Sequence, residues 1–138
     1  MGLLMNSREE IKESVVNRFG KEKSYLVGFK HNSLGKNILK ILLSKLYYIF
    51  DNSRTFILVF DNKGIYEKEI SNSTRTDFYL FPESEIENFE INNKTNKSII
   101  SFDHLGKNIS YEVPMTGRIF KDNKENLAAL VKNNWERI

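Results

Sequence analysis

The first regular pattern along the chain is helical. Ile11, Val15 and Phe19 recur every four residues, so they share one face of an α-helix. Residues 7–10 have the Ser-x-x-Glu pattern of a capping box, in which two side chains satisfy backbone N–H groups of the first turn. These features predict an N-terminal helix over residues 7–19.

A strand and a second helical pattern follow. Residues 24–30 alternate in part, with Tyr25, Val27 and Phe29 on one side, and predict a strand. Apolar residues then fall at helical spacing, at Leu34, Ile38, Ile41, Leu42 and Tyr47. We expect a helix over residues 34–49, inserted between the first two strands.

From residue 55 onward the pattern is that of strands and hairpins. Apolar runs rich in β-branched and aromatic residues are separated by turn residues such as those at 61–64, whose Asn and Gly tolerate positive φ. The predicted strands lie at 55–60, 65–70, 77–81, 86–91, 98–102 and 109–113. Short connections of this kind favour sequential antiparallel pairing.

The chain ends in a third helical pattern, over residues 122–136. Asp122 or Asn123 is expected to cap it, and Phe120 is placed to pack back as a hydrophobic staple. The apolar face is expected to contain Leu127, Leu130, Val131 and Trp135.

The order of elements predicts a single α+β domain over residues 1–138. We expect an antiparallel β-barrel or curved sheet of about seven strands within residues 24–113. An antiparallel sheet with one buried face needs a cover, and the C-terminal helix is placed to supply it. The N-terminal helix and the insertion at 34–49 complete the architecture.

This order of seven short strands and one capping helix resembles the bacterial pleckstrin-homology-like (PH-like) domains. Three segments carry the likeness. Residues 56–70, FILVFDNKGIYEKEI, resemble the central hairpin of these domains. Residues 81–91, FPESEIENFEI, resemble the segment after it, and residues 120–135, FKDNKENLAALVKNNW, resemble the terminal helix.

The resemblance implies a binding or oligomerising module, because members of this group are mostly small proteins without a known reaction. Bacterial PH-like domains assemble into rings, and their eukaryotic relatives bind phosphoinositides or peptides. The phosphoinositide pattern places basic residues on the first two strands around a short loop. Here Lys30 and Arg54 stand near those strand ends, but the helical pattern of 33–50 separates them, which disfavours phosphoinositide binding.

The composition is that of a globular domain without disulfides. The chain has 138 residues, of which 40% are hydrophobic and 28% are charged, as in ordinary globular domains. It contains no cysteine, which excludes disulfides and cysteine-ligated zinc. The first residues do not resemble a signal peptide, and no segment is apolar enough to span a bilayer. We therefore expect a cytoplasmic protein.

No motif for catalysis or cofactor binding is recognised. Six residues separate Gly28 from Gly35, whereas a phosphate-binding loop has four between its glycines. His31 and His104 lie beside predicted turns, where surface positions are expected rather than a metal site. We expect no enzyme activity, no cofactor and no metal.

Charge is unevenly distributed. Residues 20–50 are rich in lysine, whereas residues 76–91 carry acidic residues and no basic ones. Glu83, Glu85 and Glu87 have a spacing of two, which predicts one face of a strand. The residues expected to form an interaction surface are Lys30, Lys36, Lys40, Lys45, Arg54, Glu83, Glu85 and Glu87. An ordinary solvated surface is the alternative for all of them.

These observations favour a non-enzymatic module that binds a protein partner or another copy of itself. The alternative is binding to an anionic membrane surface through the basic amphipathic segment 33–50. Outward lysines on a helix that packs against a sheet would give the same pattern. Nucleic acid is disfavoured, because the net charge of +3 is modest and no nucleic-acid-binding motif is found.

Overall fold

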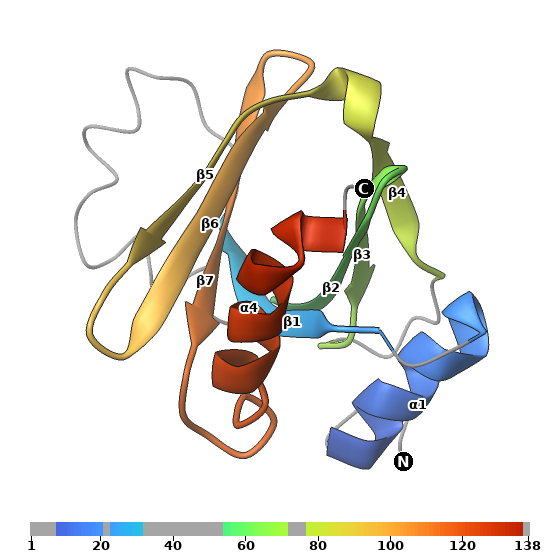
Figure 1. Cartoon of the computed structure of the whole chain (residues 1–138), viewed down its shortest axis with the longest axis vertical. Helices are drawn as coiled ribbons and strands as arrows, with labels where there is room; N and C mark the ends of the chain where they lie inside the picture. The colour runs from blue at the N-terminus through green and yellow to red at the C-terminus, as the bar shows by residue number, and fades with distance from the viewer. Residues whose placement is uncertain (1–7, 21–22, 32–53, 72–76, 137–138) are drawn as a thin grey trace.

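The computed structural model describes residues 8–20, 23–31, 54–71 and 77–136, and all structural statements below refer to these residues (Figure 1). They form an α+β fold built on a single seven-stranded antiparallel sheet. The strands are β1 (Tyr25–His31), β2 (Thr55–Asp61), β3 (Gly64–Glu69), β4 (Tyr79–Pro82), β5 (Ile86–Asn93), β6 (Lys97–His104) and β7 (Lys107–Pro114). The predicted helix over 34–49 lies outside the described residues.

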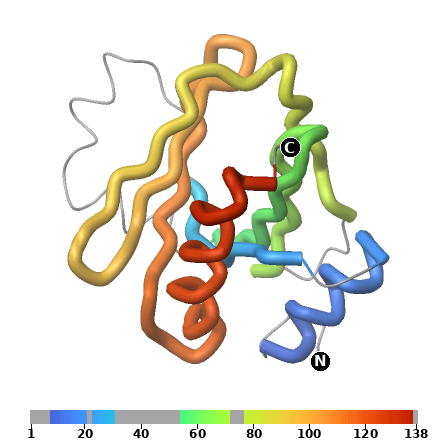
Figure 2. Tube along the Cα trace, viewed as in Figure 1, coloured from blue at the N-terminus to red at the C-terminus, as the bar shows by residue number. Residues whose placement is uncertain are grey.

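The strand order across the sheet is β4-β3-β2-β1-β7-β6-β5, so β4 and β5 are its two edges. The short 3₁₀ helix η2 (Glu83–Glu85) carries the chain from one edge to the other (Figure 2). The expected seven antiparallel strands are therefore confirmed. Of the two expected forms, barrel and curved sheet, the barrel is wrong, because β4 and β5 do not pair and the sheet stays open.

The sheet has an apolar core on each face. Alternate residues of β2 point to opposite sides, and Phe56, Leu58 and Phe60 belong to the core on the concave face. Ile57 and Val59 belong to the core on the convex face. All five are buried, which explains why this strand is almost continuously apolar.

The C-terminal helix α4 (Asn123–Lys132) covers the concave face (Figure 1). Leu130 is fully buried there, and Leu127 packs at the border of the same core. The 3₁₀ turn η3 (Asn134–Glu136) has positive φ angles, including 58° at Trp135. This left-handed turn ends the helix and returns the Trp135 side chain to the core against Phe60.

Two expectations for this helix are wrong. Val131 was expected on the apolar face, but it is 56% exposed, because it follows Leu130 directly and points away from the sheet. Asp122 is the N-cap residue, yet its side chain makes no capping hydrogen bond. Its carboxylate binds the Arg8 guanidinium instead, with N···O distances of 2.9 and 3.0 Å.

The N-terminal helix α1 (Arg8–Phe19) lies on the convex side of the sheet. Ile11 and Val15 are buried against the convex core, and Phe19 contacts the rings of Tyr66 and Phe78 edge-on. Four-residue spacing thus places three apolar side chains on one surface, as the sequence predicted. The ion pair between Arg8 and Asp122 joins the start of α1 to the start of α4.

Strand β1 connects the two halves of the sheet. It pairs with β2 from Tyr25 to Phe29, but with β7 only from Phe29 to His31. Gly28 lies where β7 passes closest, since a Cβ on this residue would stand 2.6 Å from the carbonyl oxygen of Glu112. Any side chain here would therefore push β1 and β7 apart.

On the N-terminal side of Gly28, where β1 no longer pairs with β7, a side chain bonds to the backbone of β1 instead. The buried Asn123 accepts a hydrogen bond from the Val27 N–H at 2.9 Å and donates one to the Val27 carbonyl at 2.8 Å. Its amide also donates to the carbonyl of Pro114, the last residue of β7, at 2.7 Å. One asparagine therefore satisfies the edge of β1 as a neighbouring strand would, and joins it to β7.

Replacing Asn123 with Ala should lower the free energy of unfolding by about 2–4 kcal/mol, because it leaves several buried backbone groups without partners at about 1–3 kcal/mol each. Urea denaturation measures the change. Asn126→Ala, a half-buried position on the same helix, is the matched control and should cost less than about 1 kcal/mol. Equal stability of the two variants would contradict the role of Asn123.

Candidate functional site

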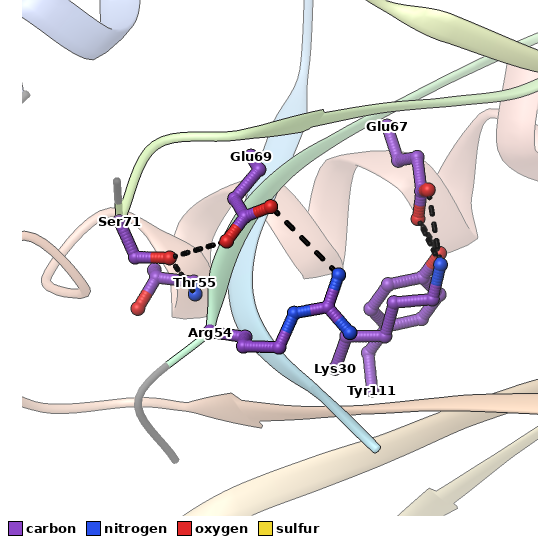
Figure 3. A network of polar contacts seen from close by, with 7 residues as sticks. All are labelled: Lys30, Arg54, Thr55, Glu67, Glu69, Ser71 and Tyr111. Carbon is purple, nitrogen blue, oxygen red and sulfur yellow. Dashed lines mark hydrogen bonds and ion pairs between the residues drawn. The ribbon is translucent and has the colours of Figure 1, made fainter. Parts of the chain in front are cut away.

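A cluster of charged residues lies on the concave face, with Lys30 near the end of β1 (Figure 3). Strand alternation puts it there: Ile65 of β3 points into the concave core, so Glu67 and Glu69 follow on the same side. In the register of β1 with β7, Lys30 stands opposite Tyr111. The fold thus brings one lysine, two glutamates and a tyrosine onto one apolar surface.

The deepest part of the cluster is formed by Lys30, Glu67 and Tyr111. The Lys30 ammonium lies 3.0 Å from both carboxylate oxygens of Glu67. The Tyr111 hydroxyl also donates to this carboxylate, in a short hydrogen bond. The side chains of Lys30 and Glu67 are 17% and 12% exposed, and Tyr111 is fully buried.

Aromatic rings surround the ammonium of Lys30. Its nitrogen lies 5.2 Å from the ring centre of Phe56, 5.6 Å from that of Phe81 and 6.0 Å from that of Tyr111. Ring faces carry negative electrostatic potential, so these contacts add to the attraction of Glu67. Lys30 is therefore held by its charge partner and by the apolar core together.

A second group extends the cluster toward solvent. The Arg54 guanidinium lies 3.7 Å from the carboxylate of Glu69, and its side chain is 42% exposed. The Ser71 hydroxyl donates to Glu69 at 3.0 Å and accepts from the Thr55 N–H at 3.0 Å. This outer group ties the end of β3 to the beginning of β2.

The chemistry of the cluster is that of a closed network. Burial raises the pKa of Tyr111 well above its ordinary value, and the negative charge of Glu67 raises this pKa further. The phenol therefore stays protonated near neutral pH and remains a donor. Because Glu67 already receives bonds from an ammonium and a hydroxyl, we interpret the network as a structural element that fixes the strands relative to one another.

The structure separates the residues predicted to form an interaction surface. Lys30 and Arg54 belong to the cluster on the concave face, where Glu67 and Glu69 are their ion-pair partners. Lys36, Lys40 and Lys45 lie outside the described residues, so membrane contact through 33–50 stays a prediction. None of the helices described is long and apolar enough to cross a bilayer.

The expectation that three glutamates share one face of a strand is wrong. Glu83 and Glu85 lie in η2, and only Glu87 lies in β5. The Glu85 carboxylate is 2.8 Å from the Nε2 atom of His104, whose ring packs edge-on against Phe81. Within the described parts of the chain, no group of three or more His, Cys, Asp or Glu side chains is arranged to hold a metal ion.

The edge strand β5 offers a different kind of site. Its inner side pairs with β6, while no other described strand pairs with its outer side. A bulge between Glu87 and Glu90 interrupts the register, and pairing is regular from Glu90 to Asn93. Ile86, Phe89 and Ile91 are only partly buried, along the border of the concave core.

A small half-open pocket lies beside the first half of this strand. Three aromatic rings meet in it, with centres 4.9 Å apart for Phe60 and Trp135 and 5.2 Å apart for Phe89 and Trp135. Two carboxylates, of Asp61 and Glu83, also line it. The remaining lining residues are Gly64, Ile65 and Ile86.

Sequence reasoning missed both features for identifiable reasons. In the strand predicted at 65–70, Glu67 and Glu69 lie on the same face as the apolar Ile65. Two glutamates on the face expected to be buried were the available signal for the charged cluster. The pocket had no such signal, since its residues come from five separate elements, β2, β3, η2, β5 and η3.

Removing one partner of the Lys30–Glu67 pair should be costly, because the other charge stays buried. We expect Lys30→Met and Glu67→Gln each to lower the free energy of unfolding by about 2–4 kcal/mol. The loss in the double variant should be smaller than the sum of the two single losses, by more than about 1 kcal/mol. A double-mutant cycle in urea measures this coupling. Lys97 and Glu112, a more exposed pair at 3.5 Å, provide the control cycle and should couple by less than about 1 kcal/mol.

The raised pKa of Tyr111 predicts a loss of stability in alkali. Below about pH 10 the phenol is protonated in both the folded and unfolded chain; above it the unfolded chain ionises first. The free energy of unfolding should therefore fall as pH rises through this range, by up to about 1.4 kcal/mol per pH unit for one group. Denaturation at pH 8–11 should show a shallower fall for Tyr111→Phe than for wild type, and parallel curves would contradict the assignment.

Comparison with known proteins adds no family to this description. Neither the models of known protein families nor the curated protein sequences give a match to the chain. Its function is therefore inferred from the geometry of its own residues.

Proposed function

We propose that this chain is a non-enzymatic binding module of PH-like fold, and that it binds an extended segment of a protein partner along the outer edge of β5. The observation that carries the proposal is the outer side of this eight-residue strand, with which no other strand in the described part of the chain pairs. An exposed edge presents backbone N–H and C=O groups that an added strand can pair with. The other edge, β4, has four residues and offers a shorter template.

The arrangement of elements supports the PH-like part of the proposal. Seven antiparallel strands are followed by one helix that covers the concave face, which is the order that the sequence resemblance implied. The sheet divides into β1–β4 and β5–β7, joined through β1 and β7.

The surroundings of β5 support binding of a side-chain-bearing segment. An added strand would turn alternate side chains toward the concave side, where Phe89 and Ile91 are partly uncovered. Backbone pairing would supply affinity and these apolar residues would supply selectivity.

The charged cluster on the concave face favours binding over catalysis. A general base or nucleophile needs an accessible, poised group. Here Lys30, Glu67 and Tyr111 bind one another in a buried network. Such a network is better suited to keeping the sheet rigid, and a rigid edge reduces the entropy that binding would otherwise cost.

Proline substitution tests the edge directly. Neighbouring residues of a strand point their N–H groups to opposite sides, so one of Glu90→Pro and Ile91→Pro removes a bond to β6 and the other removes only an outward N–H. Each proline variant is compared with the alanine variant at the same position. The proline that removes a bond to β6 should lower the melting temperature, and the proline that removes only the outward N–H should not. We call the latter the edge-proline variant.

The edge-proline variant should lose partner binding. Ten-residue peptides selected on the wild-type chain from a random display library should bind this variant at least ten-fold more weakly, because one pairing donor is missing and the ring blocks the edge. Binding is measured by isothermal titration. Equal binding to wild type and the edge-proline variant would contradict the proposal.

Sedimentation of the chain alone, at low and high salt, decides whether another copy is the partner. Self-association through β5 should disappear in the edge-proline variant. A strict monomer at high concentration leaves a different protein as the partner, and association that the proline does not affect places the contact elsewhere than at this edge.

A further inference from the structure

We infer that the pocket lined by Phe60, Phe89 and Trp135 receives the ammonium group of a lysine side chain, carried by the segment that docks on β5. This inference rests on the proposed function and specifies the partner: a basic, extended segment with a lysine facing the concave side. Four observations support it, namely the chemistry of the pocket, its size, its position beside the strand and the acidic charge around that strand.

The pocket combines the two kinds of group that attract an organic cation. Phe60, Phe89 and Trp135 meet edge to face, with interplanar angles of 66–75°, so their ring faces point in different directions. Ring faces attract cations, and indole does so most strongly. The carboxylates of Asp61 and Glu83 stand in the same lining, and none of the lining residues that the structure describes is basic.

The size of the pocket selects the ammonium. Its interior has room for about one group of the size of a water molecule, which is also the size of an ammonium group. A planar guanidinium or a trimethylated ammonium is larger. The pocket should therefore prefer lysine to arginine and to trimethyllysine, even though bulkier cations suit open aromatic sites.

The position of the pocket connects it to the edge strand. Ile86 and Phe89 line it from β5, on the side of the strand that faces the concave core. The residue of an added strand opposite Phe89 would share this side, with Cβ atoms about 4.5–5.5 Å apart. The long aliphatic stem of a lysine can then lie along Phe89 while its charge enters the pocket.

Charge complementarity selects a basic partner over a second β5. Residues 77–93, which include both η2 and β5, contain no lysine or arginine. Glu87 and Glu90 are exposed on the strand itself. Two copies of this acidic strand would repel when paired, whereas a basic segment gains from the same charges.

The single tryptophan provides the measurement. Trp135 is the only tryptophan in the chain, so its fluorescence reports occupancy of the pocket directly. The probes are four acetylated and amidated ten-residue peptides of threonine and valine that differ only at the central residue, which is lysine, arginine, trimethyllysine or norleucine. We expect the lysine peptide to bind at least ten-fold more tightly than the norleucine peptide, and more tightly than the other two.

Variants of the pocket identify the source of the preference. Glu83→Gln should reduce the advantage of lysine over norleucine about five-fold, because it removes a charge and keeps the shape. Glu125→Gln on α4, outside the pocket, is the matched control and should leave the advantage unchanged. Neither position belongs to a buried core, so both variants should fold.

The two levels of the proposal fail separately. If lysine and norleucine peptides bind equally while the edge-proline variant weakens both, the inference about the pocket is wrong and edge binding stands. If the edge-proline variant binds the lysine peptide as tightly as wild type, the proposed docking on β5 is wrong. If none of the four peptides binds, both are wrong.

Discussion

The fold depends on how β1 divides its two sides between different partners. β2 pairs with β1 from Tyr25 to Phe29, whereas β7 reaches only its last residues, so the two halves of the sheet diverge along this strand. Divergence exposes backbone groups, and buried backbone groups without partners are costly. Asn123 removes that cost by bonding both backbone groups of Val27 and the end of β7. The same asparagine begins α4, so the helix that covers the concave face is fixed at the point where the sheet opens.

The charged cluster can be understood from the same divergence. The start of α4 is fixed at Val27, whereas Lys30 lies three residues further along β1, where this strand pairs with β7. There Lys30, Glu67 and Tyr111 form part of the concave interior. A wholly apolar filling of similar volume would match or exceed them in stability, but the fixed geometry of the bonds between β1, β3 and β7 restricts how these strands can slide. The polar network thus favours one strand register over its alternatives.

Much of the fold was predictable because it follows from local patterns. The apolar faces of strands and of α1, and the turn at 61–64, are set by neighbours close in sequence, and the structure places them as expected. Long-range choices were not predictable. Asp122 and Asn123 are good capping residues, yet Asp122 binds Arg8 and Asn123 binds Val27, because these tertiary partners offer ion pairing and relief of buried backbone groups. Val131 shows the same limit: its exposure depends on how α4 is rotated on the sheet.

The edge strand β5 carries acidic residues that affect which strands can pair with it. Natural proteins protect edge strands with charges and bulges, and β5 has Glu87, Glu90 and a bulge between them. Protection by one sign of charge is selective, because it repels a second acidic strand and attracts a basic one. The bulge also turns the backbone near Phe89, a residue that lines the aromatic pocket. Features that keep β5 from pairing with its own copies are therefore the ones that would recognise a lysine-bearing partner.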